Sequence, residues 1–356
     1  MFKQILKFIF GIIVIALAIY GGVYAWFQLK VVENIHQTDV YEAIPANPDM
    51  MLIVHRPASL PEVWNVCSKF SNFLPEERSL TVVDAVGKSQ LCGEQCIAKE
   101  PLIMCYYPHG TLLLSRMKTR DFRYMERKFF KTNLSGFAPK KETYKDAVIN
   151  IKATNDESFF CYTLYNNIFI GSFRKRLVQE AIDAYIQQSG LKNDSTFNDA
   201  MATLNKLDKN TLAGLYLSNP NESFIFKELT SDTLNHWLTG DIKIREPIIE
   251  ISGFFPVNQQ DTSSVVSDLT FQMISQDASY LKHFHPENAI DSIFSIITEN
   301  GTECWQNPAF QTIFKEHFDN GVHKIVWMRK EYHDLLLFVS PHHSDKFYSL
   351  SIVREP

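Results

Sequence analysis

An uncharged stretch near the amino terminus limits what this chain can fold into more than any other feature. Residues 8–29 form 22 consecutive positions without Asp, Glu, Lys or Arg. As an α-helix, such a segment measures about 33 Å, which is enough to cross the hydrocarbon core of a bilayer. Aromatic residues gather at its far end, as they do where transmembrane helices meet water: Tyr20, Tyr24 and Trp26. The stretch predicts a single transmembrane helix through which the protein contacts the membrane.

Two lysine residues set the expected orientation. Lys3 and Lys7 precede the apolar stretch, and basic residues favour the cytoplasmic side of a membrane. We therefore expect residues 1–30 to form an anchor with a short cytoplasmic tail, and the rest of the chain to be exported. A cleaved signal peptide is the alternative, with Val23-Tyr24-Ala25 as the cleavage site. The apolar run exceeds the usual signal core of about 7–15 residues, which favours a retained anchor.

The remainder of the chain has the composition of a folded protein. The 356 residues are 45% hydrophobic and 21% charged, which is typical of a globular protein with its own core. The net charge of −5 makes the chain a poor ligand for polyanions, so no nucleic-acid partner is expected. We expect a linker over 31–43, an exported α+β domain over 44–245, and a β-rich continuation over 246–356 packed on the same domain.

Hairpins dominate the pattern of the exported part. LIMCYY (102–107) and TLLLSRM (111–117) flank a Pro-His-Gly turn, and SFFCYTLY (158–165) and IFIGS (168–172) flank Asn166-Asn167. Asn tolerates the positive φ that two-residue hairpin turns require. Because strands come as neighbouring hairpins between helices, the expected fold class is α+β. A mostly antiparallel sheet with packed helices should follow the transmembrane helix.

Other elements follow from the same patterns. A short amphipathic helix over 121–131 carries a basic face made of Arg120, Arg123, Arg127 and Lys128. Two helix–turn–strand segments beginning at Phe197 and Phe310 are similar, which fits either a degenerate duplication or chance. The other expected helices are 61–75, 173–188, one starting at Asp194-Ser195, 222–237 and 287–299. The other expected strands are 50–55, 147–153, 211–218, 248–255, 264–274, 323–329, 334–340 and 347–353.

Three segments of the chain resemble a family of uncharacterised bacterial envelope proteins. They are IPANPDMMLIVHRPASL (44–60), the strand-Gly-Ser-helix unit at 168–188, and DSTFNDAMATL (194–204). Proteins of this family have an amino-terminal membrane anchor and an exported domain of unknown function. The resemblance implies a single-pass protein of the bacterial inner (cytoplasmic) membrane with its carboxy-terminal domain in the periplasm. It implies no catalytic residues.

A cluster of cations after Gly171 raises the question of an anion site. Arg174, Lys175 and Arg176 crowd at a helix start, where the helix dipole favours negative rather than positive groups. Ser172 and Arg174 could hold a phosphate or carboxylate together with the backbone N–H groups of that turn. The alternative is a solvated helix face, because successive side chains on a helix diverge by about 100° and cannot all face one ligand.

Histidine and cysteine give further candidate sites. His283 and His285 lie on one side of an extended segment and could bind a metal, and surface histidines on polar loops are the alternative. Cys92 and Cys96 could form a local disulfide or remain free thiols. A zinc site at this pair would need a second pair of ligands, which does not follow in the sequence.

Recognisable catalytic motifs are absent from the sequence. It contains no phosphate loop, no GxGxxG, no GxSxG nucleophile elbow and no HExxH. No cofactor is expected, and we favour a membrane-anchored periplasmic protein that binds or scaffolds an envelope protein or a polymer. One alternative is a domain that binds a lipid or other apolar ligand through its many Phe and Tyr side chains. The other is an envelope hydrolase that uses Cys304, with His317 and Asp319, or the carboxy-terminal histidines.

Overall fold

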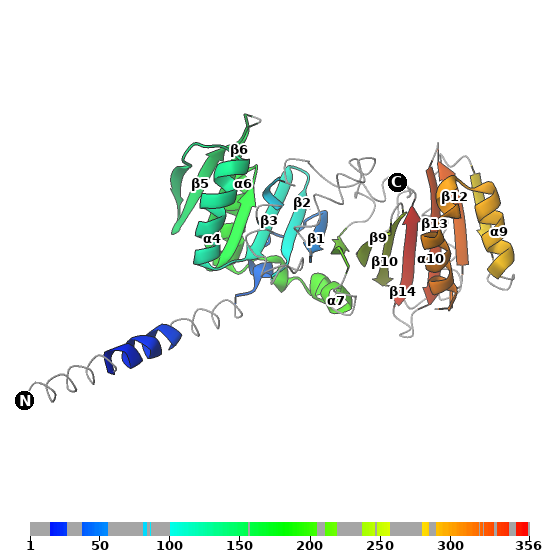
Figure 1. The fold of residues 1–356 in the computed structure, drawn as a ribbon, viewed down its shortest axis with the longest axis horizontal. Coiled ribbons are helices and arrows are strands. Elements are labelled where there is room, and N and C mark those ends of the chain that lie inside the picture. The colour runs from blue at the N-terminus through cyan, green and yellow to red at the C-terminus, as the bar shows by residue number, and fades with distance from the viewer. Residues whose placement is uncertain are drawn as a thin grey trace, which may run out of the picture.

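One antiparallel sheet of 14 strands organises the part of the chain that the structure describes (Figure 1). The computed structural model describes residues 15–26, 38–55, 81–83, 86, 100–155, 157–204, 211–218, 237–245, 248–256, 280–284, 290–319, 321–322, 324–330, 333–341 and 347–354. Within these ranges every strand pair is antiparallel, and helices pack on the sheet. The α+β class with a mostly antiparallel sheet is therefore confirmed.

Most elements lie close to the ranges that the hydrophobic patterns predict, whereas the strands over 140–144 and 238–245 were not expected. The strands are β1 (Met50–Val54), β2 (Leu102–Tyr107), β3 (Gly110–Arg116), β4 (Lys140–Tyr144), β5 (Ala147–Ala153), β6 (Phe159–Tyr165), β7 (Ile168–Ser172), β8 (Ala213–Leu217), β9 (Leu238–Arg245), β10 (Ile248–Pro256), β11 (Tyr280–Phe284), β12 (Lys324–Lys330), β13 (His333–Pro341) and β14 (Phe347–Arg354). The main helices are α4 (Thr119–Met125), α6 (Lys175–Gln187), α7 (Ser195–Leu204), α9 (Ile290–Asn300) and α10 (Pro308–Asp319). Short helical turns are η1 (Val40–Ala43), η4 (Leu191–Asn193) and η6 (Glu303–Gln306).

Two halves of the sheet have the same strand order. The first seven strands are arranged as β1-β2-β3-β7-β6-β5-β4, and the last seven as β8-β9-β10-β14-β13-β12-β11. In each half a three-strand meander is followed by a four-strand meander, and the final strands of the two meanders pair. The similarity between the segments at Phe197 and Phe310 does not correspond to this repeat. α7 leads into the first strand of the second half, whereas α10 leads into its fifth strand.

The two halves join where β1 pairs with β8. Leu52 faces Leu215 in the middle of this pair, and Met50 and Val54 face Leu217 and Ala213 at its ends. All five residues of each strand are buried. Because alternate side chains of a strand point to opposite faces of the sheet, both faces are covered at this point. The junction therefore lies inside the hydrophobic core.

Helices cover both faces of the sheet. α6 and α7 pack on the face that carries Met51 and Tyr216, and α9 and α10 pack on the face that carries Trp327. Following the cross-strand register from β1 to β12 shows that this is one and the same face. α4 packs on the opposite face, where the ring of Phe122 contacts Tyr162 and Phe169.

The single helix expected over 121–131 is divided into three pieces. α4 continues into η3 (Glu126–Phe130), a π-helical turn, and then into α5 (Lys131–Asn133). A π-turn accommodates one more residue than an α-turn. Here it places Phe130 against Phe160, Tyr162 and Phe169 in the core.

Turn chemistry explains two of the connections. Asn166 and Asn167 have φ values of 46° and 62°, as the expected two-residue hairpin between β6 and β7 requires. Helix α6 ends within one residue of the expected position 188, and its C-cap residue Gln188 has a φ of 52°. Gly190, two residues further on, is required for close packing, because a Cβ at this position would overlap the carbonyl oxygen of Glu42.

The amino-terminal stretch is described in its middle part. Residues 15–26 are helical, and all of their side chains are exposed. Within the described residues, no helix has the length and apolar character that crossing a membrane demands. The expected helices 61–75 and 222–237 and the expected strand 264–274 lie outside the described residues.

Replacing Gly190 by Ala should destabilise the first half of the sheet. The new methyl group would push η1 away from η4, where Leu191 N–H donates a hydrogen bond to Ile44 O at 2.9 Å. Overpacking of this kind costs roughly 1–3 kcal/mol, and thermal unfolding should show a lower midpoint. Gly136→Ala is the control, because a Cβ there meets nothing within 4 Å. Equal midpoints for the two variants would contradict this explanation of Gly190.

Candidate functional site

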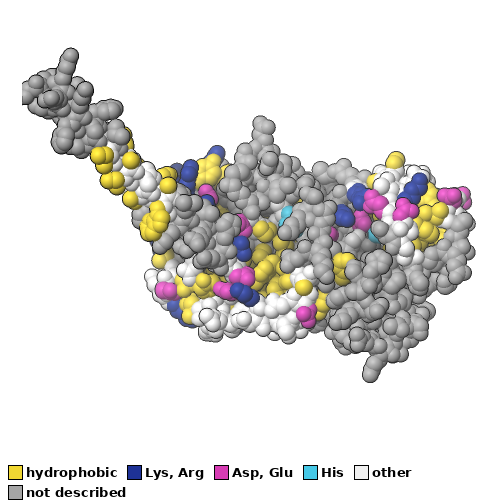
Figure 2. Space-filling view, turned by 90° about the horizontal axis from the view of Figure 1, so that it is seen from below, with side chains coloured by type: hydrophobic (Ala, Val, Ile, Leu, Met, Phe, Trp, Pro, Cys, Tyr) yellow, Lys and Arg dark blue, Asp and Glu magenta, His cyan; other side chains and the backbone are white. Residues whose placement is uncertain are grey.

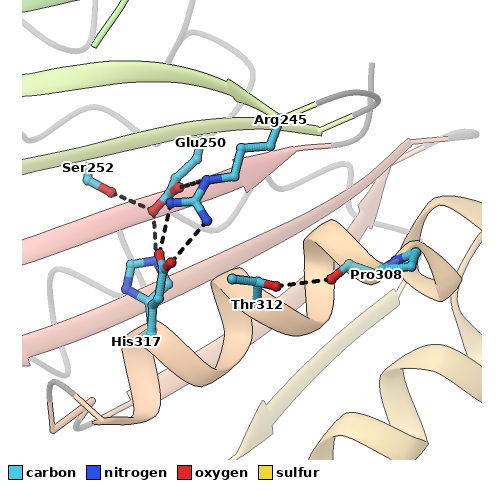
Figure 3. A network of polar contacts seen from close by, with 7 residues as sticks. Arg245, Glu250, Ser252, Pro308, Thr312 and His317 are labelled. Carbon is cyan, nitrogen blue, oxygen red and sulfur yellow. Dashed lines mark hydrogen bonds and ion pairs between the residues drawn. The ribbon is translucent and has the colours of Figure 1, made fainter. Parts of the chain in front are cut away.

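Helix α10 and the β9–β10 hairpin bring together a cluster of charged side chains (Figure 3). Arg245 is the last residue of β9, and Glu250 lies on β10 just after the hairpin turn. Glu316 and His317 lie near the carboxy-terminal end of α10, where Glu316 contacts Arg245 and His317 contacts Glu250. The cluster was not predicted from the sequence, although a carboxylate at the third position of the apolar strand IIEISGFF is a signal that could have pointed to it.

Glu250 is the buried centre of the cluster. Its side chain is 2% exposed. One carboxylate oxygen, Oε1, lies 3.1 Å from His317 Nε2 and accepts a hydrogen bond of 3.0 Å from the Ser252 hydroxyl. The other oxygen, Oε2, accepts no hydrogen bond from the described residues, and the guanidinium Nε of Arg245 lies 3.6 Å from it. An ionised carboxylate at this depth depends on these cationic partners.

Arg245 connects the buried carboxylate to the surface. Its two terminal nitrogens donate to Glu316 in a bidentate arrangement, with distances of 3.1 and 2.8 Å. The imidazole of His317 stacks on Phe338, with ring centroids 4.6 Å apart. The cluster thus fastens the end of α10 to three strands of the second half.

The environment holds Glu250 in its ionised form. Burial acts to raise the pKa of its carboxyl group. The hydrogen bond and charge of His317, with the charges of Lys243 and Arg245, outweigh burial and leave the pKa of Glu250 below its usual value. The cations therefore stabilise the folded state through this carboxylate.

The geometry of the cluster is not that of an activated nucleophile. In a Ser–His–acid triad the hydroxyl donates to the imidazole, which in turn donates to the acid. Here Ser252 and His317 both contact the same oxygen of Glu250. The expected hydrolase combination of Cys304 with His317 gains no support, because Nε2 of His317 faces Glu250. The side chain of Cys304, in η6, lies outside the described ones.

A second buried carboxylate fastens η6 to the sheet. Asp334 on β13 is fully buried and receives hydrogen bonds of 2.6 and 2.9 Å from the guanidinium of Arg329. The indole N–H of Trp305 donates to Asp334 at 2.9 Å, and the backbone N–H of Thr302 donates at 3.2 Å. Because its partners come from β12, from η6 and from the residues just before η6, this cluster fixes the position of η6 on the sheet.

At the candidate anion site at the start of α6, several groups contact other parts of the protein itself. The hydroxyl of Ser172 donates to Thr111 O at 2.7 Å and accepts from Arg174 N–H at 3.0 Å. Lys175 and Arg176 form ion pairs with Glu142 and Glu180 at 3.0 and 2.7 Å. Arg174 is exposed at the helix start. The structure brings Ser172 and Arg174 together through the backbone, and these contacts resolve the crowding of charge that the sequence shows.

The metal and disulfide candidates are only partly described. His283 lies on β11 opposite Val326, its side chain is outside the described ones, and so is all of His285. Cys92 and Cys96 also lie outside the described residues. No group of three metal-ligating side chains occurs among the residues that are described. Of the described thiols, Cys105 and Cys161 are free and buried, and burial raises the pKa of Cys161 to about 11, so this thiol is unreactive at neutral pH.

Comparison with known proteins gives little guidance. No protein-family model and no curated protein matches the sequence. Two crystal forms of a protein named TP0453 are similar in structure, with TM-scores of 0.39 and 0.38 and sequence identities of 9% and 7%. The matches cover 65% and 66% of this chain and 84% and 86% of TP0453. At these scores no argument about function passes from TP0453 to this chain.

Replacing Glu250 by Gln should test the charge cluster. At neutral pH the variant loses the ionic contacts of a buried carboxylate, and we expect a lower midpoint of urea unfolding, corresponding to about 1–3 kcal/mol. Because the folded pKa of Glu250 is lowered, its stabilising effect is present above the unfolded value of 4.5 and is lost as the pH falls through the folded value. The difference between natural protein and variant should therefore shrink in acid.

Glu316→Gln is the matched control for this experiment. It removes a carboxylate from the same cluster, but one that is 47% exposed, so it should cost less than about 1 kcal/mol. A difference between natural protein and Glu250→Gln that stays constant or grows in acid would contradict the assignment of Glu250 as an ionised buried group.

Proposed function

We propose that this protein is a single-pass protein of the bacterial inner membrane whose periplasmic domain binds or scaffolds an envelope protein or polymer. The uncharged stretch 8–29 would hold the chain in the membrane, with Lys3 and Lys7 on the cytoplasmic side. The resemblance to anchored envelope proteins of unknown function supports the same compartment.

The exposure of the amino-terminal helix carries the proposal. Ile15, Leu17 and Ile19 are 61%, 65% and 62% exposed, and hydrophobic side chains cover this helix in the space-filling view (Figure 2). None of the three belongs to a hydrophobic cluster of the described residues. A helix that leaves its apolar side chains uncovered requires another apolar environment, which a bilayer supplies.

The arrangement of aromatic side chains favours a scaffold over a lipid-binding domain. Phe130, Phe160, Tyr162 and Phe169 contact one another in the core of the first half. A second group around Phe310 and Phe314 packs in the core of the second half. These aromatic side chains are therefore used for packing in the core. Because the aromatic side chains of these two groups are taken up by the core, they favour a binding surface over an aromatic-lined lipid pocket.

Two aspartate substitutions in the apolar helix should release the protein from membranes. Each Asp at the centre of a transmembrane helix costs roughly 2.5–3.5 kcal/mol on insertion scales. We expect Leu17→Asp with Ile19→Asp to move the full chain from the membrane pellet, after alkaline carbonate washing, to the soluble fraction. Immunoblotting of the two fractions provides the measurement.

Val148→Asp with Ile186→Asp is the matched control. These two apolar side chains are also exposed, at 47% and 42%, but they lie on the folded body. The control variant should remain in the pellet. If the natural protein is found in the soluble fraction, or with the body facing the cytoplasm, the proposed function is wrong.

A further inference from the structure

A basic surface lies on the outer side of α4, η3 and α5. Between residues 118 and 131 the sequence has six cations and two carboxylates, a local net charge of +4 on a chain whose net charge is −5. The exposed cations, which we call the basic face, are Arg120, Arg123, Arg127, Lys128 and Lys131. The sequence anticipated this face on the expected helix 121–131, except for Lys131.

The helix itself turns the basic face away from the body. Phe122, Met125 and Phe130 are buried in the core on the inner side. Tyr124, Arg127, Lys128 and Lys131 follow at spacings of three and four residues, which places them on a common side. The division into an apolar inner side and a basic outer side is that of an amphipathic surface helix.

Acidic side chains of the described residues do not neutralise this face. None of its five cations lies within ion-pair distance of a described carboxylate, whereas Lys145, Lys175 and Lys192 on the same half each contact one. The carboxylate of Glu126, within the same segment, is turned inward and accepts a hydrogen bond of 2.9 Å from the Tyr162 hydroxyl. The positive charge is therefore available to an anionic partner.

Aromatic side chains accompany the cations. Tyr124 is 41% exposed and Phe137, after α5, is 77% exposed. Tyr124 holds the ammonium group of Lys128 in place. Lys128 Nζ donates a hydrogen bond to the Tyr124 hydroxyl at 2.8 Å and lies 5.3 Å from the centroid of the Tyr124 ring. Exposed aromatic rings beside long basic side chains suit the boundary between lipid headgroups and acyl chains.

We propose that the basic face binds the anionic headgroups of the bilayer that holds the amino-terminal anchor, which is a step that rests on the proposed function. The chain enters the body at η1, which contacts α6 and β3 in the same half as α4. Eight residues, 30–37, separate the apolar stretch from the first described residue of the body. Fully extended they reach about 29 Å, so the body stays close to the membrane surface. Because the body is tethered near the bilayer, the local concentration of headgroups around the basic face is high. This favours binding of headgroups over binding of a soluble polyanion with the same charge.

Hydrogen exchange of the full chain in vesicles tests this docking directly. The protein is reconstituted into vesicles of pure phosphatidylcholine and into vesicles containing phosphatidylglycerol, and peptides covering 8–29 and 119–133 are followed by mass spectrometry. We expect 8–29 to be protected in both lipids. Peptides from 119–133 should exchange at least about fivefold more slowly with the anionic lipid, as expected for a cation held at a charged surface.

A pair of charge reversals and a matched control distinguish binding through the basic face from an effect of the net charge of the chain. Arg123→Glu with Arg127→Glu should abolish the effect of phosphatidylglycerol on 119–133. Arg174→Glu with Lys315→Glu makes the same change in charge at two exposed positions, the N-cap of α6 and a residue of α10, on the opposite face of the sheet, and should leave the effect intact. Far-ultraviolet circular dichroism of both variants checks that they are folded.

The possible results distinguish this inference from the proposed function. Protection of 8–29 together with identical exchange of 119–133 in the two lipids would overturn the docking and leave the anchor in place. Exchange of 119–133 that slows with a soluble polyanion but not with phosphatidylglycerol would also overturn it, in favour of a polymer ligand. Unprotected 8–29 in both lipids would overturn the proposed function itself.

Discussion

The pairing of β1 with β8 is the contact on which the rest of the structure depends. β1 lies near the start of the body and β8 near the middle of the chain, and their antiparallel ladder makes one sheet out of two seven-stranded halves. Both strands are buried along their whole length. If this ladder opened, it would expose apolar side chains on both faces at once, at about 25 cal/mol for each Å² of apolar surface. The identical strand order of the halves shows that one arrangement of a three-strand and a four-strand meander is used twice.

In the second half, buried charged clusters determine how η6 and α10 are positioned on the sheet, which apolar contacts alone do not determine. Glu250 and Asp334 are buried carboxylates, and each is held by an arginine and by a donor from the α9–α10 region. Apolar contacts are not directional, whereas a buried carboxylate tolerates few arrangements of its partners. These two clusters therefore select one position of η6 and α10 on the sheet. Their geometry accounts for a structural role.

The sequence predicted elements with strong local signals and missed features that depend on distant contacts. The hairpin at Asn166-Asn167 and the cap at Asp194, whose carboxylate accepts from Thr196 N–H at 2.8 Å, are encoded within a few residues. The strand order, the β1–β8 junction and the Arg245–Glu250–His317 cluster join segments that lie far apart in the chain, and periodicity does not report such pairs. The π-turn η3 was missed because its apolar spacing is close to that of an α-helix. Ser172 and Arg174 lie at the start of α6, and the carboxylates that pair with the neighbouring Lys175 and Arg176 come from β4 and α6.

Native-state hydrogen exchange at the junction tests the central claim most directly. The amide protons of Met50–Val54 and Ala213–Leu217 would be followed as denaturant is added in small steps. A single sheet joined through β1 and β8 predicts that both sets are among the slowest to exchange and that they lose protection together. If β8 loses protection while β1 and the other strands of the first half remain protected, the two halves are independent units and the account is wrong.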